Sequence, residues 1–212
     1  MHRKTVDQQL DAPNTGGEKD TQREKDGQET LFVALKAEIG EMQFGRDEWL
    51  TPDLAERKRL ARDRFKDAYD AQMQGELLEA IRLYKESIDA YPTSEAHTFL
   101  GWTYSFQGLT DEAIEQCHLA IEVDPDFGNP YNDIGAYLIE KGDLTGAIDW
   151  LKRAMSAVRY ESYYYPHFNL GRVYEARGQL LEALAEYKAA IDLNPRYGLA
   201  ITAFRRLQAR LN

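Results

Sequence analysis

The chain has 212 residues, 43% of them hydrophobic, and a net charge of −10. It can bury a real core in one or two domains, but it has no run of about 18 apolar residues that would span a bilayer. The densest basic stretch, residues 57–64, is interleaved with acidic side chains, so we expect no nucleic-acid partner.

The N-terminal region divides into two predicted segments. Residues 1–28 are polar and charged and are predicted to be disordered, because they cannot bury enough apolar surface to offset the entropy of ordering. Residues 29–60 are predicted to be a helical extension, in which Thr51 and Pro52 begin a long helix that runs to about Gln74. There is no apolar stretch of a secretory signal, and the single cysteine, Cys117, fits a reducing compartment. We therefore expect a cytoplasmic location.

From about residue 61 the chain repeats itself. The positions Ala68, Gly101, Gly135 and Gly171, which we call the anchors, are separated by 33, 34 and 36 residues. A glycine follows each anchor by seven residues and an alanine follows it by twelve. A proline follows by 24, except in the third repeat, where Arg159 replaces it and a two-residue insertion comes next. Self-similarity at one period is typical of a repeat protein.

The residue types at these positions have physical reasons. A small anchor on the first helix of a repeat (helix A) and the alanine on the second (helix B) allow the two helices to cross closely. The glycine ends helix A, because a left-handed backbone costs little only for glycine. The proline ends helix B, because it cannot continue the hydrogen-bond ladder. Large or apolar residues sixteen after each anchor are predicted to fill the space between repeats, namely Tyr84, Cys117, Leu151 and Tyr187.

This pattern resembles the tetratricopeptide repeat (TPR) family. Its glycine, tyrosine, glycine and alanine positions are matched twice, by Gly101, Tyr104, Gly108 and Ala113 and by Gly171, Tyr174, Gly178 and Ala183. The resemblance implies an all-α fold, a right-handed superhelix of helix–turn–helix repeats. Four repeats are expected within residues 61–197, at about 61–93, 94–127, 128–163 and 164–197. Residues 198–212 read as a capping helix, because Arg205 occupies the anchor position and no fifth repeat follows.

No group of residues forms a recognisable catalytic site. His97 and His167 each lie four residues before an anchor, so we interpret both as packing residues rather than metal ligands. Cys117 occupies a packing position, and on a helix its neighbour His118 points about 100° away, which argues against a Cys–His nucleophile. There is no Gly-rich phosphate loop and no metal-ligand spacing. We therefore expect that the protein is not an enzyme and needs no metal and no cofactor.

The TPR resemblance places a partner-binding groove on the A helices. Its lining positions are three before, one after and five after each anchor, and Asn169 lies where an asparagine of the family often binds the backbone of an extended peptide. Exposed aromatic side chains indicate a binding surface, although the same rings would also suit packing between neighbouring A helices. The candidate groove residues are Phe65, Tyr69, Trp102, Phe106, Asn132, Phe168, Asn169 and Arg172.

The predicted function is therefore a scaffold or adaptor that binds another protein through an extended peptide or an amphipathic helix. The alternatives are a regulatory subunit of an enzyme complex and a self-assembling structural solenoid. Some TPR cochaperones bind the C-terminal carboxylate of a partner with a clamp that contains lysine and arginine. The corresponding positions of this chain carry no lysine or arginine, so we do not expect it to bind a C-terminal carboxylate in this way.

The sequence permits more than one role for each of two further segments. Residues 160–165, YESYYY, offer tyrosines to a partner or else cover the gap widened by the insertion. Residues 31–44 are apolar at helical spacing and are candidates to dock into the groove of their own chain or of a second copy.

Overall fold

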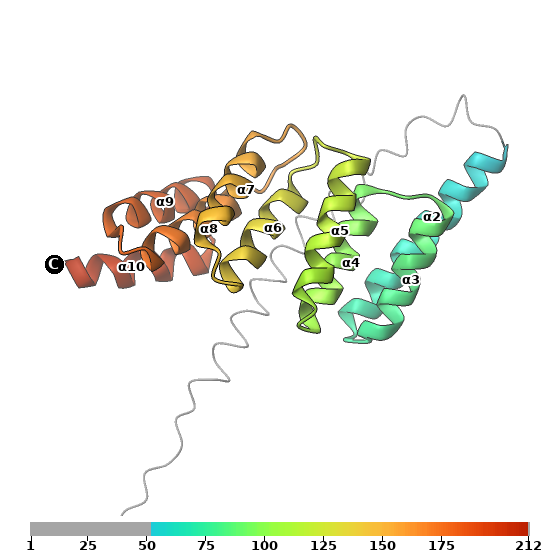
Figure 1. Cartoon of the computed structure of the whole chain (residues 1–212), viewed down its shortest axis with the longest axis horizontal. Helices are drawn as coiled ribbons and strands as arrows, with labels where there is room; N and C mark the ends of the chain where they lie inside the picture. Colours follow the sequence, from blue (N-terminus) through green and yellow to red (C-terminus); the bar gives the residue numbers. More distant parts are fainter. Residues whose placement is uncertain (1–51, 212) are drawn as a thin grey trace, which may run out of the picture. The chain divides into compact units, whose positions relative to one another are not determined.

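The structure is a computed structural model that describes residues 52–211 (Figure 1). The predictions for residues 1–28 and 31–44 fall outside the described residues. The described range contains α2 (Pro52–Met73), α3 (Leu77–Ala90), α4 (Ser94–Phe106), α5 (Thr110–Val123), α6 (Asn129–Glu140), α7 (Leu144–Ser156), α8 (Tyr164–Ala176), α9 (Leu180–Leu193) and α10 (Gly198–Leu211).

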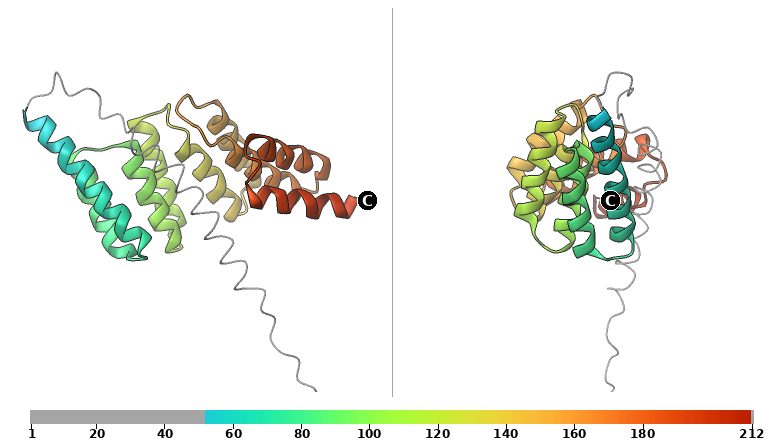
Figure 2. Two further views of the ribbon diagram at one scale, coloured as in Figure 1. Left: turned by 180° about the vertical axis from the view of Figure 1, so that it is seen from behind. Right: turned by 90° about the vertical axis from the view of Figure 1, so that its right-hand side faces the viewer.

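Within residues 52–211 these helices form successive hairpins that stack one on the next (Figure 2). The pairs are α2–α3, α4–α5, α6–α7 and α8–α9, and α10 packs on α9. The all-α repeat solenoid predicted from the sequence is confirmed. The helix α2 is continuous from Pro52 to Met73, so the expected boundary between an extension and the first repeat, at residues 60 and 61, lies inside a single helix.

The turn inside each hairpin depends on one glycine. Gly75, Gly108, Gly142 and Gly178 have φ values of 79°, 75°, 83° and 76°, in the left-handed region that disfavours side chains. These are the four glycines found seven residues after the anchors, and each one follows the end of its helix A. The predicted helix ends are therefore confirmed.

The anchor glycines allow helix A and helix B of one repeat to cross closely. At Gly135 and Gly171, the side chain that fills the space beside the glycine belongs to the residue sixteen positions later. A Cβ added at Gly171 would lie 2.4 Å from Cε1 of Tyr187, and one at Gly135 would lie 2.6 Å from Cδ2 of Leu151. These large residues therefore cover the anchor of their own repeat. Leu151 also packs against Leu170 of the next repeat, so it fills the space between repeats as predicted.

The third repeat, which lacks its proline, is joined to the second by Arg159. Its guanidinium pairs with Glu95 at 2.6 Å and with Asp124. Its backbone N–H donates to the carbonyl of Asp126 at 2.9 Å, and its carbonyl accepts from the N–H of Gly128 at 3.0 Å. The inserted segment is thus attached to the loop between α5 and α6, a contact that a proline at this position could not make.

The last helix, α10, is attached to α8 through Glu175. One carboxylate oxygen of Glu175 accepts from Arg206 at 2.6 Å and from the hydroxyl of Tyr187 at 2.9 Å, while the other lies 3.4 Å from Arg210. Ala203 and Leu207 of α10 are buried against the last repeat.

Candidate functional site

The candidate site is a surface on the A helices α2, α4, α6 and α8. We define the A surface as the residues one and five positions after each anchor, which are Tyr69, Met73, Trp102, Phe106, Ala136, Glu140, Arg172 and Ala176. The residues five after the anchor are exposed, and Met73 and Phe106 are 47% and 46% exposed. The residues one after the anchor are half-buried, apart from Tyr69, which is 7% exposed.

The positions three before the anchor lie mostly beneath this surface. Phe65 is 3% exposed and Asn132 is 8% exposed, because the next repeat covers each of them. Only Phe168 remains half-buried, and its ring packs edge-on against Tyr197 at 5.2 Å. Phe65 and Asn132 therefore support the candidate site from below and offer little surface of their own.

An aromatic cluster forms the base of the A surface in the first two repeats. Its centre is Phe99, whose ring centroid lies 5.2 Å from that of Phe65, 5.9 Å from that of Tyr69 and 5.5 Å from that of Trp102. The sequence-based selection of groove residues missed Phe99. Phe99 and Trp102 are three residues apart, which makes the two rings neighbours on one helix, and this spacing could have identified Phe99 from the sequence.

A ladder of polar side chains replaces the aromatic rings in the last two repeats. The amide of Asn169 donates to Oδ1 of Asn132 at 3.0 Å, and Arg172 donates to Oδ1 of Asn169 at 3.1 Å. The amide of Asn132 donates in turn to Oδ1 of Asp133 at 3.3 Å. The structure thus brings together three predicted site residues that lie on two different helices.

Asp133 ends this ladder inside the protein. Burial raises the pKa of Asp133 to about 7, and the hydrogen bond from Asn132 acts in the opposite direction. Burial also raises the pKa of the Cys117 thiol, with a smaller contribution from the nearby Asp133 charge. A fully buried thiol of this kind is a packing group rather than a nucleophile.

The two histidines that lie four residues before an anchor, His97 and His167, have equivalent contacts. Nδ1 of His97 lies 2.9 Å from Oε1 of Gln116, and Nδ1 of His167 lies 2.7 Å from Oε2 of Glu186. Each pair links helix A to helix B of one repeat. Residues 52–211 contain no group of histidine, cysteine and carboxylate side chains arranged to hold a metal ion.

The tyrosines of residues 160–165 are engaged in packing. Tyr160 is buried and its ring lies 5.4 Å from that of Tyr163, whose hydroxyl donates to the carbonyl of Ala157 at 3.0 Å. The rings of Tyr164 and Tyr165 lie 5.0 and 5.4 Å from that of Tyr197. These contacts favour the interpretation in which residues 160–165 cover the gap that the two-residue insertion opens between repeats, over the one in which their tyrosines bind a partner.

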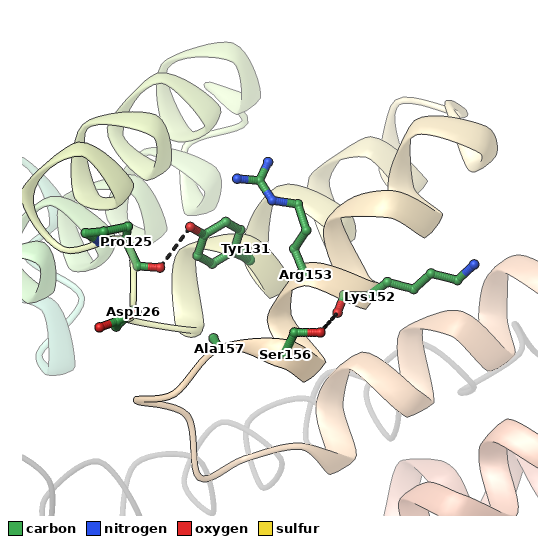
Figure 3. Close-up of a pocket in the computed structure, with 7 residues that line it drawn as sticks. All are labelled: Pro125, Asp126, Tyr131, Lys152, Arg153, Ser156 and Ala157. Carbon is green, nitrogen blue, oxygen red and sulfur yellow. Dashed lines mark hydrogen bonds between the residues drawn. The ribbon is translucent and has the colours of Figure 1, made fainter.

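A shallow pocket of about 350 Å³ lies at the opposite end of α6 from the exposed part of the A surface (Figure 3). The ring of Tyr131 forms one wall, its hydroxyl donates to the carbonyl of Pro125 at 2.9 Å, and the guanidinium of Arg153 lies 4.7 Å from the ring centroid. The lining residues are Pro125, Asp126, Tyr131, Lys152, Arg153, Ser156 and Ala157. Its charged side chains are exposed and of both signs, so it shows no built anion or cation site.

Two of the four repeats match models of a known protein family. Residues 94–127, which include α4–α5, and residues 164–197, which include α8–α9, match family models described as tetratricopeptide repeat. A UDP-N-acetylglucosamine–peptide N-acetylglucosaminyltransferase of Giardia intestinalis is 31% identical over 135 residues, which are 57% of this chain and 9% of that protein. The chain therefore spans under a tenth of the length of this relative.

Among solved structures, PilF of Pseudomonas aeruginosa aligns with a TM-score of 0.68 at 17% identity, covering 73% of this chain and 70% of PilF. YrrB, a TPR protein with an unusual peptide-binding site, aligns with a TM-score of 0.56 at 18% identity, covering 68% of this chain and 74% of YrrB. At these identities the likeness concerns the fold. No helix within residues 52–211 is long and apolar enough to cross a bilayer.

Proposed function

Because this chain is a tetratricopeptide-repeat protein, we propose that it is a scaffold or adaptor that holds a segment of a partner protein along the A surface. The observation that carries the proposal is the apolar strip of Met73, Trp102 and Phe106. Met73 and Phe106 are nearly half exposed on two A helices, α2 and α4. Covering such side chains with apolar groups of a partner is favourable, at about 25 cal/mol per Å² removed from water.

The polar half of the A surface supports selection among partners. Asn169 and Arg172 hold each other in position, and Arg172 keeps donors that its bond to Asn169 does not use. The peptide-binding site of YrrB supports the idea that repeats of this fold can hold a peptide. The partner is either an extended peptide or an amphipathic helix, and the segment 31–44 of the chain itself is one candidate.

We further propose that the chain is not itself an enzyme and that it works in the cytoplasm. His97, His167 and Cys117 are engaged in repeat packing, and an unpaired buried thiol fits a reducing compartment.

Light scattering over a range of concentrations separates a monomeric adaptor from a self-assembling solenoid.

Affinity capture from a lysate tests the partner-binding role. The full chain is compared with Trp102→Ala/Phe106→Ala and with Met73→Asp/Phe106→Asp, and the second variant changes only exposed side chains. The matched control is Leu78→Asp/Leu181→Asp, because Leu78 and Leu181 are 77% and 73% exposed on B helices.

We expect one set of proteins to be lost from both A-surface variants and kept by the control. Circular dichroism of each variant checks that the repeats remain folded. A set of captured proteins that is the same for all four forms would refute the role of the A surface.

A further inference from the structure

Arg172 is a half-buried positive charge that no carboxylate of residues 52–211 pairs with. Three arginines of this range are half-buried, and the other two form ion pairs: Arg64 with Glu86 at 3.1 Å and Arg159 with Glu95 at 2.6 Å. Arg172 donates instead to a neutral side-chain amide. Because a guanidinium that is partly shielded from water is less screened than an exposed one, an anionic group of a partner would be attracted to it strongly.

The polar ladder holds this guanidinium in position. Arg172 donates to Oδ1 of Asn169 at 3.1 Å, and the amide of Asn169 donates to Asn132 at 3.0 Å. Asn169 is 6% exposed, so it positions the guanidinium and offers little surface of its own to a partner. A guanidinium has five N–H donors in a fixed fork, and the bond to Asn169 uses one of them. A group held in this way loses little further freedom when a carboxylate binds it.

The acidic residues nearest to Arg172 in the fold are engaged elsewhere or lie apart from it. Glu175, one turn further along α8, accepts from Arg206 at 2.6 Å. Asp133 is separated from Arg172 by the two amides of the ladder, and burial raises the pKa of Asp133 to about 7. Glu140 is the one acidic residue of the A surface, and it is exposed on α6. An acidic side chain of a partner is therefore attracted to this surface at α8 and repelled from it at α6.

The positions of Trp102 and Arg172 set a distance that a partner must match. Both residues lie one after the anchor, on α4 and α8, and α6 with Ala136 at the same position comes between these helices along the stack (Figure 1). Two steps between helices packed at 8–10 Å amount to about 16–20 Å. In an extended chain, residues six apart lie on the same face and are about 20 Å apart. The small side chain of Ala136 leaves room for an extended backbone to pass over α6.

Resting on the proposed function, we propose that the A surface binds an extended segment of a partner protein in which an aspartate or glutamate lies six residues from a large apolar residue. The acidic side chain pairs with Arg172, and the apolar side chain packs on Trp102 and Phe106. Asn169 is a positioning residue for Arg172. One guanidinium balances one carboxylate, so a single acidic side chain within the segment is sufficient and a chain terminus is not required.

Selection from random peptides displayed on phage tests this spacing. Peptides of about 15 residues are long enough to present an extended or a helical spacing, and fusion of their C-terminal end to the coat protein leaves no free C-terminal carboxylate. The targets are the full chain, its Arg172→Glu variant and the control Arg177→Glu, which changes an exposed arginine just after α8. We expect wild type and control to enrich an acidic residue six positions from a large apolar one. Arg172→Glu should enrich lysine or arginine at that position instead.

Fluorescence anisotropy with a selected peptide, labelled with fluorescein and amidated at its C-terminus, measures the contribution of the charge. Arg172→Gln keeps a donor for Asn169 and removes the charge, and we expect it to weaken binding at least about tenfold. Moving the acidic residue of the peptide by one position places it on the other face of the extended chain and should cost as much. A peptide in which lysine replaces this acid should bind Arg172→Glu more tightly than wild type. Circular dichroism checks that each variant remains folded.

Three results would overturn the inference: selected peptides without an acidic preference, a preference that Arg172→Glu leaves unchanged, or a spacing of about eleven residues, which a helix needs to span the same distance. Equal affinity of the peptide for wild type and Arg172→Gln would also overturn it. Peptides that bind the wild type and are lost from Met73→Asp/Phe106→Asp, without depending on Arg172, leave the proposed function standing without this inference. Selected peptides that are all indifferent to both sets of variants contradict the proposed function as well.

Discussion

Replacing Asp133 with asparagine is expected to remove a large part of the pH dependence of stability between pH 5 and pH 8. Asparagine has nearly the same shape and keeps an oxygen that can accept the hydrogen bond from Asn132, which measures 3.3 Å in the wild type. It cannot ionise. The substitution therefore tests the ionisation of one buried carboxyl with little change in packing.

The direction and size follow from the pKa. Burial raises the pKa of Asp133 from 3.8 to about 7, so the folded protein keeps a proton that the unfolded chain releases above about pH 4. The stabilisation is complete below pH 3.8 and is lost as the pH rises to about 7. A pKa difference of about 3 corresponds to about 4 kcal/mol, of which about 3 kcal/mol is lost between pH 5 and pH 8.

Urea denaturation of wild type and Asp133→Asn at pH 5, 6, 7 and 8 measures this loss. Taking the difference between the two proteins at each pH cancels the titration of distant groups. The unfolding free energy of the variant, relative to wild type, should rise by about 3 kcal/mol across the range and level off above pH 7. A difference that is the same at pH 5 and pH 8 would show that Asp133 ionises at its ordinary pKa and that its burial has no such cost.

Three further outcomes follow from the packing. Gly171→Ala places a Cβ 2.4 Å from the Tyr187 ring and should lower the unfolding free energy by about 1–3 kcal/mol in urea titrations; an unchanged midpoint would mean that the ring moves away freely. Arg159→Pro restores the proline of the other repeats but removes the N–H that bonds Asp126, so thermal unfolding should shift to lower temperature, and a gain in stability would contradict the proposed junction. Glu175→Gln weakens the attachment of α10, so hydrogen exchange should become faster in that helix and stay unchanged in α4.

Much of the fold was predictable because its determinants are local. Gly108 ends α4 for a reason that depends on its own backbone angle, and Pro125 stops α5 because it lacks an N–H. Such effects act within one turn of helix, so a repeated residue type signals a repeated structure. The candidate site was less predictable. Phe65 and Trp102 are both aromatic residues at groove positions, and only the packing of the next helix makes Phe65 buried while Trp102 stays half-buried.

The sequence by itself determined the repeat, the places where helices begin and end, and which faces are apolar, because these depend on residues close together in the chain. The tertiary structure alone decided that Asn132, Asn169 and Arg172 share one ladder and that Arg159 replaces a proline with a junction to Glu95. Both arrangements join residues far apart in the chain. Hydrogen bonds and ion pairs have a range of a few ångströms, so such contacts form only after the stacking of helices has set the distances.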